Sequence, residues 1–494
     1  MTRSFYDGNG NLAKVVRPNQ YDPAADDGAG YQYTYDHQGR VLTVVGPNGH
    51  VLQTNTYEGA GRLLQQPPGL QTGAEFTYDL AKAKYSYDGY SAKTDNPVGT
   101  PLYAYAGFKI YENLAAGISL TTPYGNSLKW PKNWAGAGLI QDISLKSYVI
   151  QPTLSYKITD RLSIGVGLQL AWGNVNLSRA LMSASDLQRI GAEFESFLPL
   201  LASVPSNVIS DADKQAMQEM VASMKNADVP PAYARLEGNA HMRVGFNVGI
   251  MYDVCDQVTV GLSYRSKIKM RVKEGEASLN YANRRIEDLF TNMEDLLAKY
   301  GPMLNQLLGV TVPNISIPKY DEGSFRAELP LPSNTTLGVS YRPTDRWELA
   351  LDLQYVGWNA YDSLNVHFNE AELGIAPIKA EKNYKNSMTY RIGASYKTTD
   401  RLVLRAGVYY DQSPIRKKLY NPETPGMNKL GLSAGLTFEP YKGLQFDVAF
   451  LYIQGFSQHG KYPYKNVVTG EDEMFEGKYK STAFSPSIGI SYRF

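Results

Sequence analysis

The 494-residue sequence contains one cysteine, Cys255, and almost no net charge. A single cysteine cannot form an intrachain disulfide, so we interpret Cys255 as a small apolar residue in a turn. The 49 lysines and arginines balance the 48 aspartates and glutamates, and a net charge of +1 gives no basis for binding nucleic acid. No apolar run approaches the ~18 residues that a transmembrane helix requires.

The sequence also lacks a signal peptide and the common catalytic motifs. Residues 1–8 contain no apolar central segment of the kind that directs secretion. There is no Gly-x-Ser-x-Gly elbow, no phosphate-binding loop and no His-Glu-x-x-His motif. The histidines are scattered, at His37, His50, His241, His367 and His459. We therefore expect no catalytic residues, no metal site and no cofactor, and we do not expect an enzyme.

A clear pattern is present in the last eleven residues, 484–494. The apolar residues alternate with small or polar ones, which predicts a strand with one apolar and one polar face. The apolar set is Phe484, Pro486, Ile488, Ile490, Tyr492 and Phe494. This strand ends on an aromatic carboxy-terminal residue, and in that respect it resembles the last strand of bacterial outer-membrane proteins.

The connections between the predicted strands alternate in length. Tight turns are expected at 111–113, 158–161, 254–257, 343–346, 398–401 and 440–443. Long connections are expected at 89–100, 124–144, 179–234, 282–324, 369–383, 415–428 and 458–473. Short turns at one end and long loops at the other are typical of outer-membrane barrels. We therefore predict an all-β fold, a 14-stranded antiparallel transmembrane β-barrel with helical outer loops and a periplasmic carboxy terminus.

Two further patterns concern the barrel wall. Aromatic residues near the strand ends are expected to form girdles at the membrane interfaces: Trp347, Tyr355, Trp358, Tyr361, Tyr409, Tyr410 and Tyr452. In the first predicted strand, Phe76, Tyr78 and Leu80 share one parity, whereas Tyr85 and Tyr87 have the other. A strand that changes its apolar face requires a bulge, so we expect a bulge or a junction between two sequence types at 74–84.

The first seventy residues differ from the rest. Three units, at 6–12, 35–41 and 57–63, share a tyrosine and an acidic residue, a turn containing glycine, and then an apolar residue. This order predicts small β-hairpins. Over residues 5–66 it resembles the YD (Rhs-type) repeats of bacterial surface and toxin-shell proteins. We divide the chain into a repeat segment with its linker, 1–73, and a barrel, 74–494.

The two longest outer loops have apolar residues at helical spacing. In the first loop these are Leu187, Ile190, Phe194, Phe197, Leu198 and Leu201, and a second helix is expected from a cap at Ser210 to Met224. In the second loop they are Leu289, Phe290, Met293, Leu296, Leu297, Leu304 and Leu307. These stripes either pack the two loops against each other or line an apolar groove that binds a hydrophobic ligand, and both alternatives are open.

Residues 92–178 carry a family resemblance. The segments 92–101 and 114–125, followed by Trp130, Trp134 and 139–142, resemble the FadL/TodX family of outer-membrane transporters, and the likeness extends over about 84–494. The resemblance implies an apolar groove between the outer loops, a pocket in the lumen, and lateral exit of the substrate near a kinked third strand, in which Gly117 permits the kink. In the family an amino-terminal segment plugs the lumen, but nothing before residue 84 matches it.

Three functions remain open at this point. The first is passive transport of long-chain fatty acids or other hydrophobic small molecules across the bacterial outer membrane. The second is a FadL-like shuttle that holds protein clients of a secretion system on its outer loops. The third makes the barrel an anchor for the amino-terminal module. We expect a monomer whose partners are a hydrophobic small molecule and outer-membrane lipid.

Overall fold

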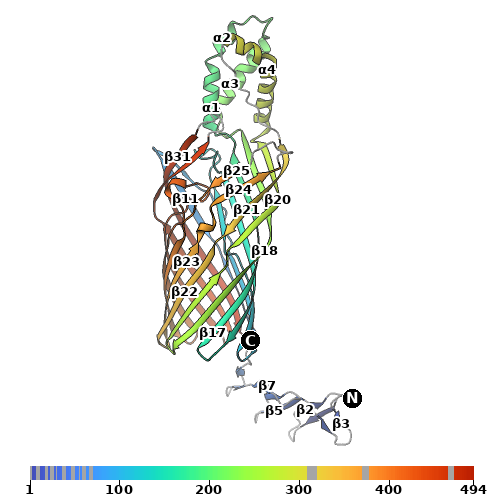
Figure 1. The fold of residues 1–494 in the computed structure, drawn as a ribbon, viewed down its shortest axis with the longest axis vertical. Helices are drawn as coiled ribbons and strands as arrows, with labels where there is room; N and C mark the ends of the chain where they lie inside the picture. Colours follow the sequence, from blue (N-terminus) through green and yellow to red (C-terminus); the bar gives the residue numbers. More distant parts are fainter. Residues whose placement is uncertain are drawn as a thin grey trace.

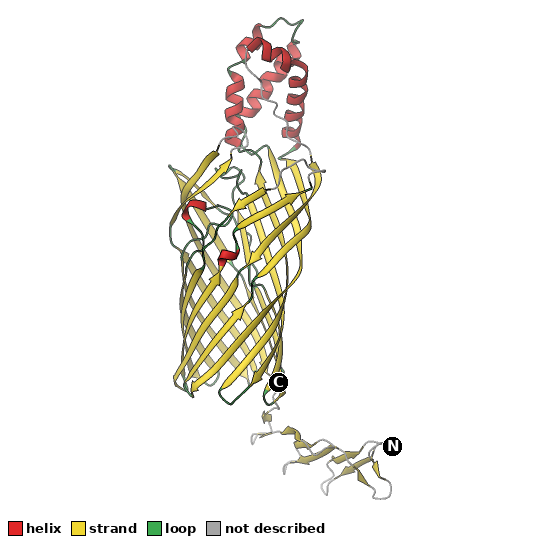
Figure 2. Cartoon of the chain, in the orientation of Figure 1, coloured by secondary structure: helices red, strands yellow, loops and turns green. Residues whose placement is uncertain are grey.

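A closed antiparallel β-barrel of fourteen strands, with a bundle of helices above one end, forms most of the molecule (Figures 1 and 2). The computed structural model describes residues 70–308, 320–369, 378–465 and 472–493, together with nine short strands between Arg3 and Gln65. The predicted fold class is therefore confirmed.

Six of the barrel strands are single segments, and eight consist of two labelled segments each. The single segments are β16 (Asp142–Lys157), β17 (Leu162–Ala180), β18 (Ala232–Cys255), β27 (Leu402–Asp411), β28 (Lys429–Tyr441) and β31 (Asp472–Arg493). The two-segment strands are β10 (Gln71–Thr77) with β11 (Leu80–Tyr87), β12 (Tyr90–Lys93) with β13 (Leu102–Tyr111), β14 (Leu114–Thr121) with β15 (Gly125–Lys129), β19 (Val258–Arg265) with β20 (Ile268–Tyr281), β21 (Tyr320–Leu331) with β22 (Ser333–Thr344), β23 (Trp347–Gly357) with β24 (Ser363–Phe368), β25 (Ile378–Glu381) with β26 (Ser387–Thr399), and β29 (Leu444–Gly455) with β30 (Gln458–Lys465).

The helices belong to the outer loops. They are α1 (Ala184–Glu195), α2 (Leu198–Ser203), α3 (Asp211–Lys225) and α4 (Arg284–Leu308), with two 3₁₀ turns, η1 (Trp358–Ala360) and η2 (Lys417–Leu419), near the barrel mouth. Ser183 and Ser210 cap α1 and α3, because each side-chain oxygen accepts a hydrogen bond from the backbone N–H three residues later. The predicted cap at Ser210 is thus confirmed. None of the helices in the described ranges is long and apolar enough to cross a membrane.

The barrel closes where the last strand pairs with the first. β31 pairs with β10 from Gln71↔Arg493 and with β11 as far as Ser86↔Lys478, and the register does not shift between these pairs. The first barrel strand is therefore continuous along β31, and the bulge expected at 74–84 is absent from it.

The change of parity in that strand has another cause. Phe76, Tyr78 and Leu80 are exposed on the outer surface, whereas Ala83 and Tyr85 are buried on the inner side. The exposed apolar residues of the outer wall form a belt that faces lipid, and we call it the apolar belt. The parities differ because the strand leaves this belt near Leu80. Below this level the outer face contacts lipid and must be apolar. Above it the outer face contacts water, and the apolar residues point inward.

Three of the six tight turns use the same Thr-Asp-Arg sequence. In each of them the threonine hydroxyl accepts hydrogen bonds from the backbone N–H of the arginine and from that of the next residue, which starts the following strand. Thr159 Oγ1 lies 3.0 Å from the N atom of Leu162, Thr344 Oγ1 lies 3.2 Å from that of Trp347, and Thr399 Oγ1 lies 3.1 Å from that of Leu402. All six tight turns occur where they are predicted.

The first and the last long connections were predicted wrongly, since residues 458–465 and 472–473 of the last one belong to β30 and β31. Residues 89–100 do not form one loop, because β11 and β12 form a hairpin whose turn residues, Asp88 and Gly89, both have positive φ. An Asp-Gly turn of this kind is favoured between two strands. The barrel wall therefore extends further beyond the membrane than the sequence pattern suggested.

The short strands before residue 66 form three small sheets. β1 (Arg3–Tyr6), β2 (Leu12–Val16), β5 (Tyr31–Tyr35), β6 (Val41–Val45) and β7 (Val51–Thr54) make one sheet, β3 (Tyr21–Asp22) pairs with β4 (Asp27–Gly28), and β8 (Thr56–Tyr57) pairs with β9 (Leu63–Gln65). The three predicted hairpins are present, since Tyr6 pairs with Leu12, Tyr35 with Val41, and Tyr57 with Leu63. The likeness to YD repeats stays a prediction. Figure 1 shows these strands outside the barrel, beyond the end that carries the carboxy terminus.

We predict that a chain lacking residues 1–69 folds and conducts ions as the full chain does, because barrel closure begins at Gln71 and the described strands before it lie outside the lumen. Heat-modifiable migration in electrophoresis measures folding, and conductance in planar bilayers measures pore closure. A clearly larger conductance after the deletion would show that the segment blocks the lumen.

Candidate functional site

The helices above the barrel pack into a small bundle that we call the hat, α1–α4 (Figure 2). Seven of the predicted groove residues are buried inside it: Leu187, Ile190, Leu201, Leu289, Phe290, Met293 and Leu296. Four are partly exposed: Phe194, Phe197, Leu198 and Leu297. The side chains of Leu304 and Leu307 lie outside the described residues. Packing between the loops therefore accounts for the buried seven, and the groove stays a proposal that depends on the exposed four.

A polar contact joins α3 to α4. Asp213, in the first turn of α3, accepts hydrogen bonds from Lys299 Nζ at 2.8 Å and Tyr300 OH at 2.6 Å, and from its own cap Ser210 at 2.7 Å. The hydrogen bond from Lys299, followed by those from Tyr300 and Ser210, holds the pKa of Asp213 well below its usual range. The carboxylate is therefore charged at neutral pH and links the two loops.

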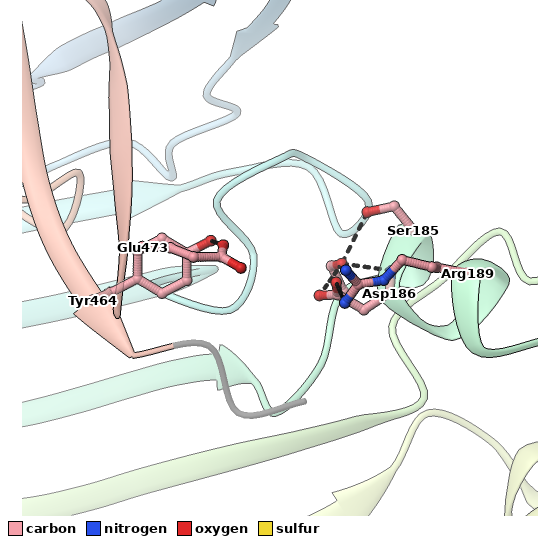
Figure 3. Close-up of polar contacts among 6 residues, drawn as sticks. Ser185, Asp186, Arg189, Tyr464 and Glu473 are labelled. Carbon is pink, nitrogen blue, oxygen red and sulfur yellow. Dashed lines mark hydrogen bonds and ion pairs between the residues drawn. The ribbon is translucent and has the colours of Figure 1, made fainter. Parts of the chain in front are cut away.

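The base of α1 stands beside the barrel rim. Asp186 accepts hydrogen bonds from the Ser183 hydroxyl at 2.6 Å and from Arg189 at 3.3 Å. Figure 3 shows Asp186 and Arg189 on the side of α1 toward Tyr464 and Glu473, which come from β30 and β31 and are hydrogen-bonded to each other. Burial, together with the charges of Glu473 and Asp186, raises the pKa of Tyr464. The first turn of α1 therefore lies close to the top of the barrel wall.

Six aromatic rings fill the mouth of the barrel below the hat. Trp130 and Trp134 stack with ring centres 4.2 Å apart, and Tyr420 and Tyr479 lie 4.7 Å apart. Tyr85 lies between Trp134 and Phe475, at 5.6 and 5.1 Å. Glycine is required beneath Tyr85, because a Cβ atom on Gly477 would be 2.1 Å from the ring. The rings bring together the first strand, the loop 130–141, the loop 412–428 and the last strand.

Beneath these rings the lumen contains a cavity of about 540 Å³. Its wall is mostly apolar and is formed by strands around the barrel, from β11, β15, β16 and β17 through β20, β21 and β24 to β29 and β31. The apolar lining includes Leu145, Val175, Leu177, Ala240, Met270, Val272, Ala327, Leu329, Leu331, Leu364 and Ile453. The loop 412–428 folds inward and closes the cavity from above with Pro414, Ile415 and Pro425.

A buried ion pair holds this loop in place. Lys382 Nζ lies 2.9 Å from Glu423 Oε2, and their side chains are 1 % and 9 % exposed. Burial alone would lower the pKa of Lys382, but the nearby Glu423 carboxylate raises it above its ordinary value, so the ammonium group stays charged. The backbone oxygen of Glu423 also accepts a hydrogen bond from Asn126 at 3.3 Å, and Tyr384 is bonded to Thr424 at 2.8 Å. The loop is therefore joined to the wall on two sides.

The barrel wall is interrupted beside the cavity. β13 and β14 pair as far as Tyr103↔Thr121, and the Thr122 hydroxyl bonds to Leu102. The next backbone contact between these two strands in the described residues is Asp95 N to Lys129 O at 2.8 Å. The cavity reaches this interruption, because all residues of the segment 123–128 line it. We call the interruption the wall gap.

Gly117 is not at this break. It pairs with Gly107 on one side and Thr153 on the other, in regular register. The third strand is instead interrupted at 122–124, between β14 and β15. The residue after Thr122 is Pro123, which has no N–H for a sheet hydrogen bond, and this is the sequence signal that could have located the break.

Some residues predicted to contact lipid line the cavity instead. Trp358 and Tyr361 belong to the cavity wall, and Tyr361 is 6 % exposed. Tyr409 points inward toward Gly431, where an added Cβ would lie 2.0 Å from its ring. Trp347, Tyr355 and Tyr452 are exposed on the outer surface, as an interfacial girdle requires.

The lower lumen is polar. Arg391 is hydrogen-bonded to Gln354, and Arg405 lies 3.8 Å from Asp447. The facing wall has small polar residues such as Thr153, Ser163 and Ser263. An apolar solute is therefore favoured in the upper cavity and disfavoured below it. In the described part of the chain, no three His, Cys, Asp or Glu residues group as a metal site would require.

The chain was compared with known proteins. A sequence model of the family described as outer membrane protein transport protein (OMPP1/FadL/TodX) matches residues 73–494. The chain is 23 % identical to the long-chain fatty acid transport protein of Escherichia coli K12, over 75 % of this chain and 74 % of that protein. It is 21 % identical to outer membrane protein P1 of Haemophilus influenzae, over 71 % and 65 % of the two chains.

Solved structures show the same fold. A Pseudomonas aeruginosa FadL homologue superposes with a TM-score of 0.63 at 19 % identity, over 86 % of this chain and 90 % of that one. The P. putida toluene transporter TodX superposes with a TM-score of 0.56 at 17 % identity, over 87 % and 91 %. The fold, its apolar outer belt and these relatives place the protein in the bacterial outer membrane. The match over residues 73–494 shows that the chain belongs to the outer membrane protein transport protein (OMPP1/FadL/TodX) family.

Proposed function

We propose that this protein carries hydrophobic small molecules passively across the outer membrane, and that long-chain fatty acids or similar apolar compounds are its substrates. One observation carries the proposal: an apolar cavity in the upper lumen meets a gap in the barrel wall. The names of the relatives, a long-chain fatty acid transport protein and a toluene transporter, indicate the substrate class. The proposed role involves no chemical reaction.

The size and lining of the cavity suit an apolar small molecule. Its volume of about 540 Å³ is within the range of typical small-molecule sites, about 300–1,000 Å³. Burying one methylene group is worth about 0.8 kcal/mol, so a long acyl chain gains enough from apolar contacts to move from water into the cavity without an energy source.

The proposed path has three parts. A solute first contacts the partly exposed apolar residues of the hat, then enters the cavity, and leaves sideways through the wall gap. The polar lower lumen, with Arg391, Arg405 and Asp447, disfavours a straight descent. The shuttle alternative would place protein clients on the outer loops. That alternative has no use for an apolar cavity inside the barrel, so the cavity favours the small-molecule function over the shuttle.

We predict that Ala327→Trp lowers fatty-acid uptake at least about tenfold, because the indole fills the cavity that Ala327 lines. The measurement is initial uptake of radiolabelled oleate by cells whose own transporter is deleted. Arg326→Trp is the matched control, since Arg326 is the exposed neighbour on the same strand. Unchanged uptake by a folded Ala327→Trp variant would remove the cavity from the path.

We also predict that a bulky group at the wall gap blocks transport. Cys255 is exposed and must first be replaced by Cys255→Ser. Ser127→Cys in this background is then labelled with a large methanethiosulfonate reagent, and Asn239→Cys, an exposed position on β18, serves as the control. Labelling at 127 should reduce oleate uptake several-fold and labelling at 239 should not. Equal uptake after complete labelling of both would argue against lateral exit.

A further inference from the structure

A row of lysines crosses the outer surface where the first and last strands meet. Lys84 on β11 is directly opposite Lys93 on β12 and directly opposite Lys480 on β31. Lys478 follows two residues from Lys480 on the same face of β31. Directly opposite side chains in an antiparallel sheet have Cβ atoms about 5 Å apart. We call Lys84, Lys93, Lys478 and Lys480 the lysine patch.

All four side chains point away from the barrel interior. Each of the four is exposed, whereas the residues that alternate with them, Ala83, Tyr85, Ala92 and Tyr479, are buried at the barrel mouth. The outward direction is therefore fixed by the alternation of the strands. The patch occupies the outer wall around the aromatic rings of the mouth, and it does not line the cavity.

The charges of the patch are not compensated by the protein. Among the described residues, none of the four lysines takes part in an ion pair. The acidic neighbour Glu476 binds Lys461 and His459, each at 2.7 Å. On another part of the wall, by contrast, Arg271 of β20 is paired with Glu328 of β21 at 2.5 Å. Like charges directly opposite in a sheet are destabilising, so the patch requires an anion from outside the chain.

The height of the patch indicates what the anion is. Phe76, Tyr78 and Leu80 on the first strand, and Ile488 and Phe484 on the last, belong to the exposed apolar belt. The pair Leu80↔Phe484 is the upper edge of the belt, and Lys84↔Lys480 follows four residues higher. Four residues span about 13 Å along a strand, or about 10 Å of height at a tilt of about 40°. Lysine side chains are long enough to reach down toward headgroups at the membrane surface.

We propose that the lysine patch binds the phosphate groups of a phosphorylated lipid in the outer leaflet, whose acyl chains lie on the apolar belt below. The patch is on the side of the long loops, so it faces the outer leaflet. Lysines whose Cβ atoms are about 5 Å apart can direct their ammonium groups at one phosphate, whose oxygens accept several charge-assisted hydrogen bonds. The bound lipid neutralises the seam at which the barrel closes. The inference depends on the outer-membrane location and is independent of the transported substrate.

The test measures lipid bound to the full-length protein. The purified chain is mixed with diphosphoryl lipid A in micelles of a neutral detergent, and native mass spectrometry counts the adducts. We expect one retained lipid for the unaltered chain and at least a tenfold lower bound fraction for Lys84→Gln/Lys480→Gln. Lys84→Arg/Lys480→Arg should retain the lipid. The matched control, Lys157→Gln/Lys397→Gln, removes two lysines from the ends of β16 and β26, next to the turns at the opposite end of the barrel, and should bind normally.

Two further measurements distinguish a phosphorylated lipid from free phosphate as the bound anion. Dephosphorylated lipid A should not be retained, and millimolar inorganic phosphate should not displace the diphosphoryl lipid, because the acyl chains contribute binding on the belt. A second measurement needs no variant: lysine acetylation of the unaltered chain, read by peptide mass spectrometry, should be slower at Lys84 and Lys480 with lipid A present and unchanged at Lys157. Equal retention by the glutamine variant, or equal acetylation with and without lipid A, would overturn the proposal.

Discussion

Hydrogen bonding of the backbone within lipid is the constraint on which this structure depends. No water reaches the bilayer core, so a sheet that crosses it must have no free edge. Here β31 removes the edge by pairing with β29 and β30 on one side and with β10 and β11 on the other. The 22 residues of β31 form the seam of the barrel. The alternation in the last residues of the sequence was informative because both of its faces are fixed by this closure.

The membrane boundary then decides which face of each strand is apolar. In the first strand the apolar residues point outward as far as Leu80 and inward from Ala83. Between β23 and β24 the 3₁₀ turn η1 has the same effect: Tyr355 of β23 is exposed on the outer surface, whereas Trp358 and Tyr361, in and directly after the turn, line the cavity. Sequence periodicity gives the alternation but not the height at which the surroundings change from lipid to water. A bulge was therefore expected where the strand is continuous, and two cavity residues were assigned to the lipid interface.

Local features were predictable from short sequence patterns, whereas the residues that line the cavity were not. The Thr-Asp-Arg turns, the cap at Ser210 and the hairpins before residue 66 each depend on a few neighbouring residues, and their sequence signals are sufficient. The cavity brings together residues from distant strands with the inward-folded loop 412–428, which is held by the pair Lys382–Glu423 across 41 positions of sequence. No short pattern encodes such a contact. The apolar stripes of the hat were recognised correctly as apolar faces, but which members are buried depends on how α1, α3 and α4 pack.

The position of the wall gap connects the fold to the proposed function. The second strand forms one edge of the gap, and the first strand pairs with it at this level: Thr77 bonds to Pro101, and Asp79 pairs with Gly99. The gap is therefore level with Tyr78 and Leu80, the exposed apolar residues at the upper edge of the belt. A solute that leaves the cavity at this height passes into the border of the hydrocarbon layer. It avoids the charged lower lumen, where an acyl chain would lose about 0.8 kcal/mol for each methylene exposed to water. Lateral exit is thus the path along which a hydrophobic solute keeps its apolar surroundings.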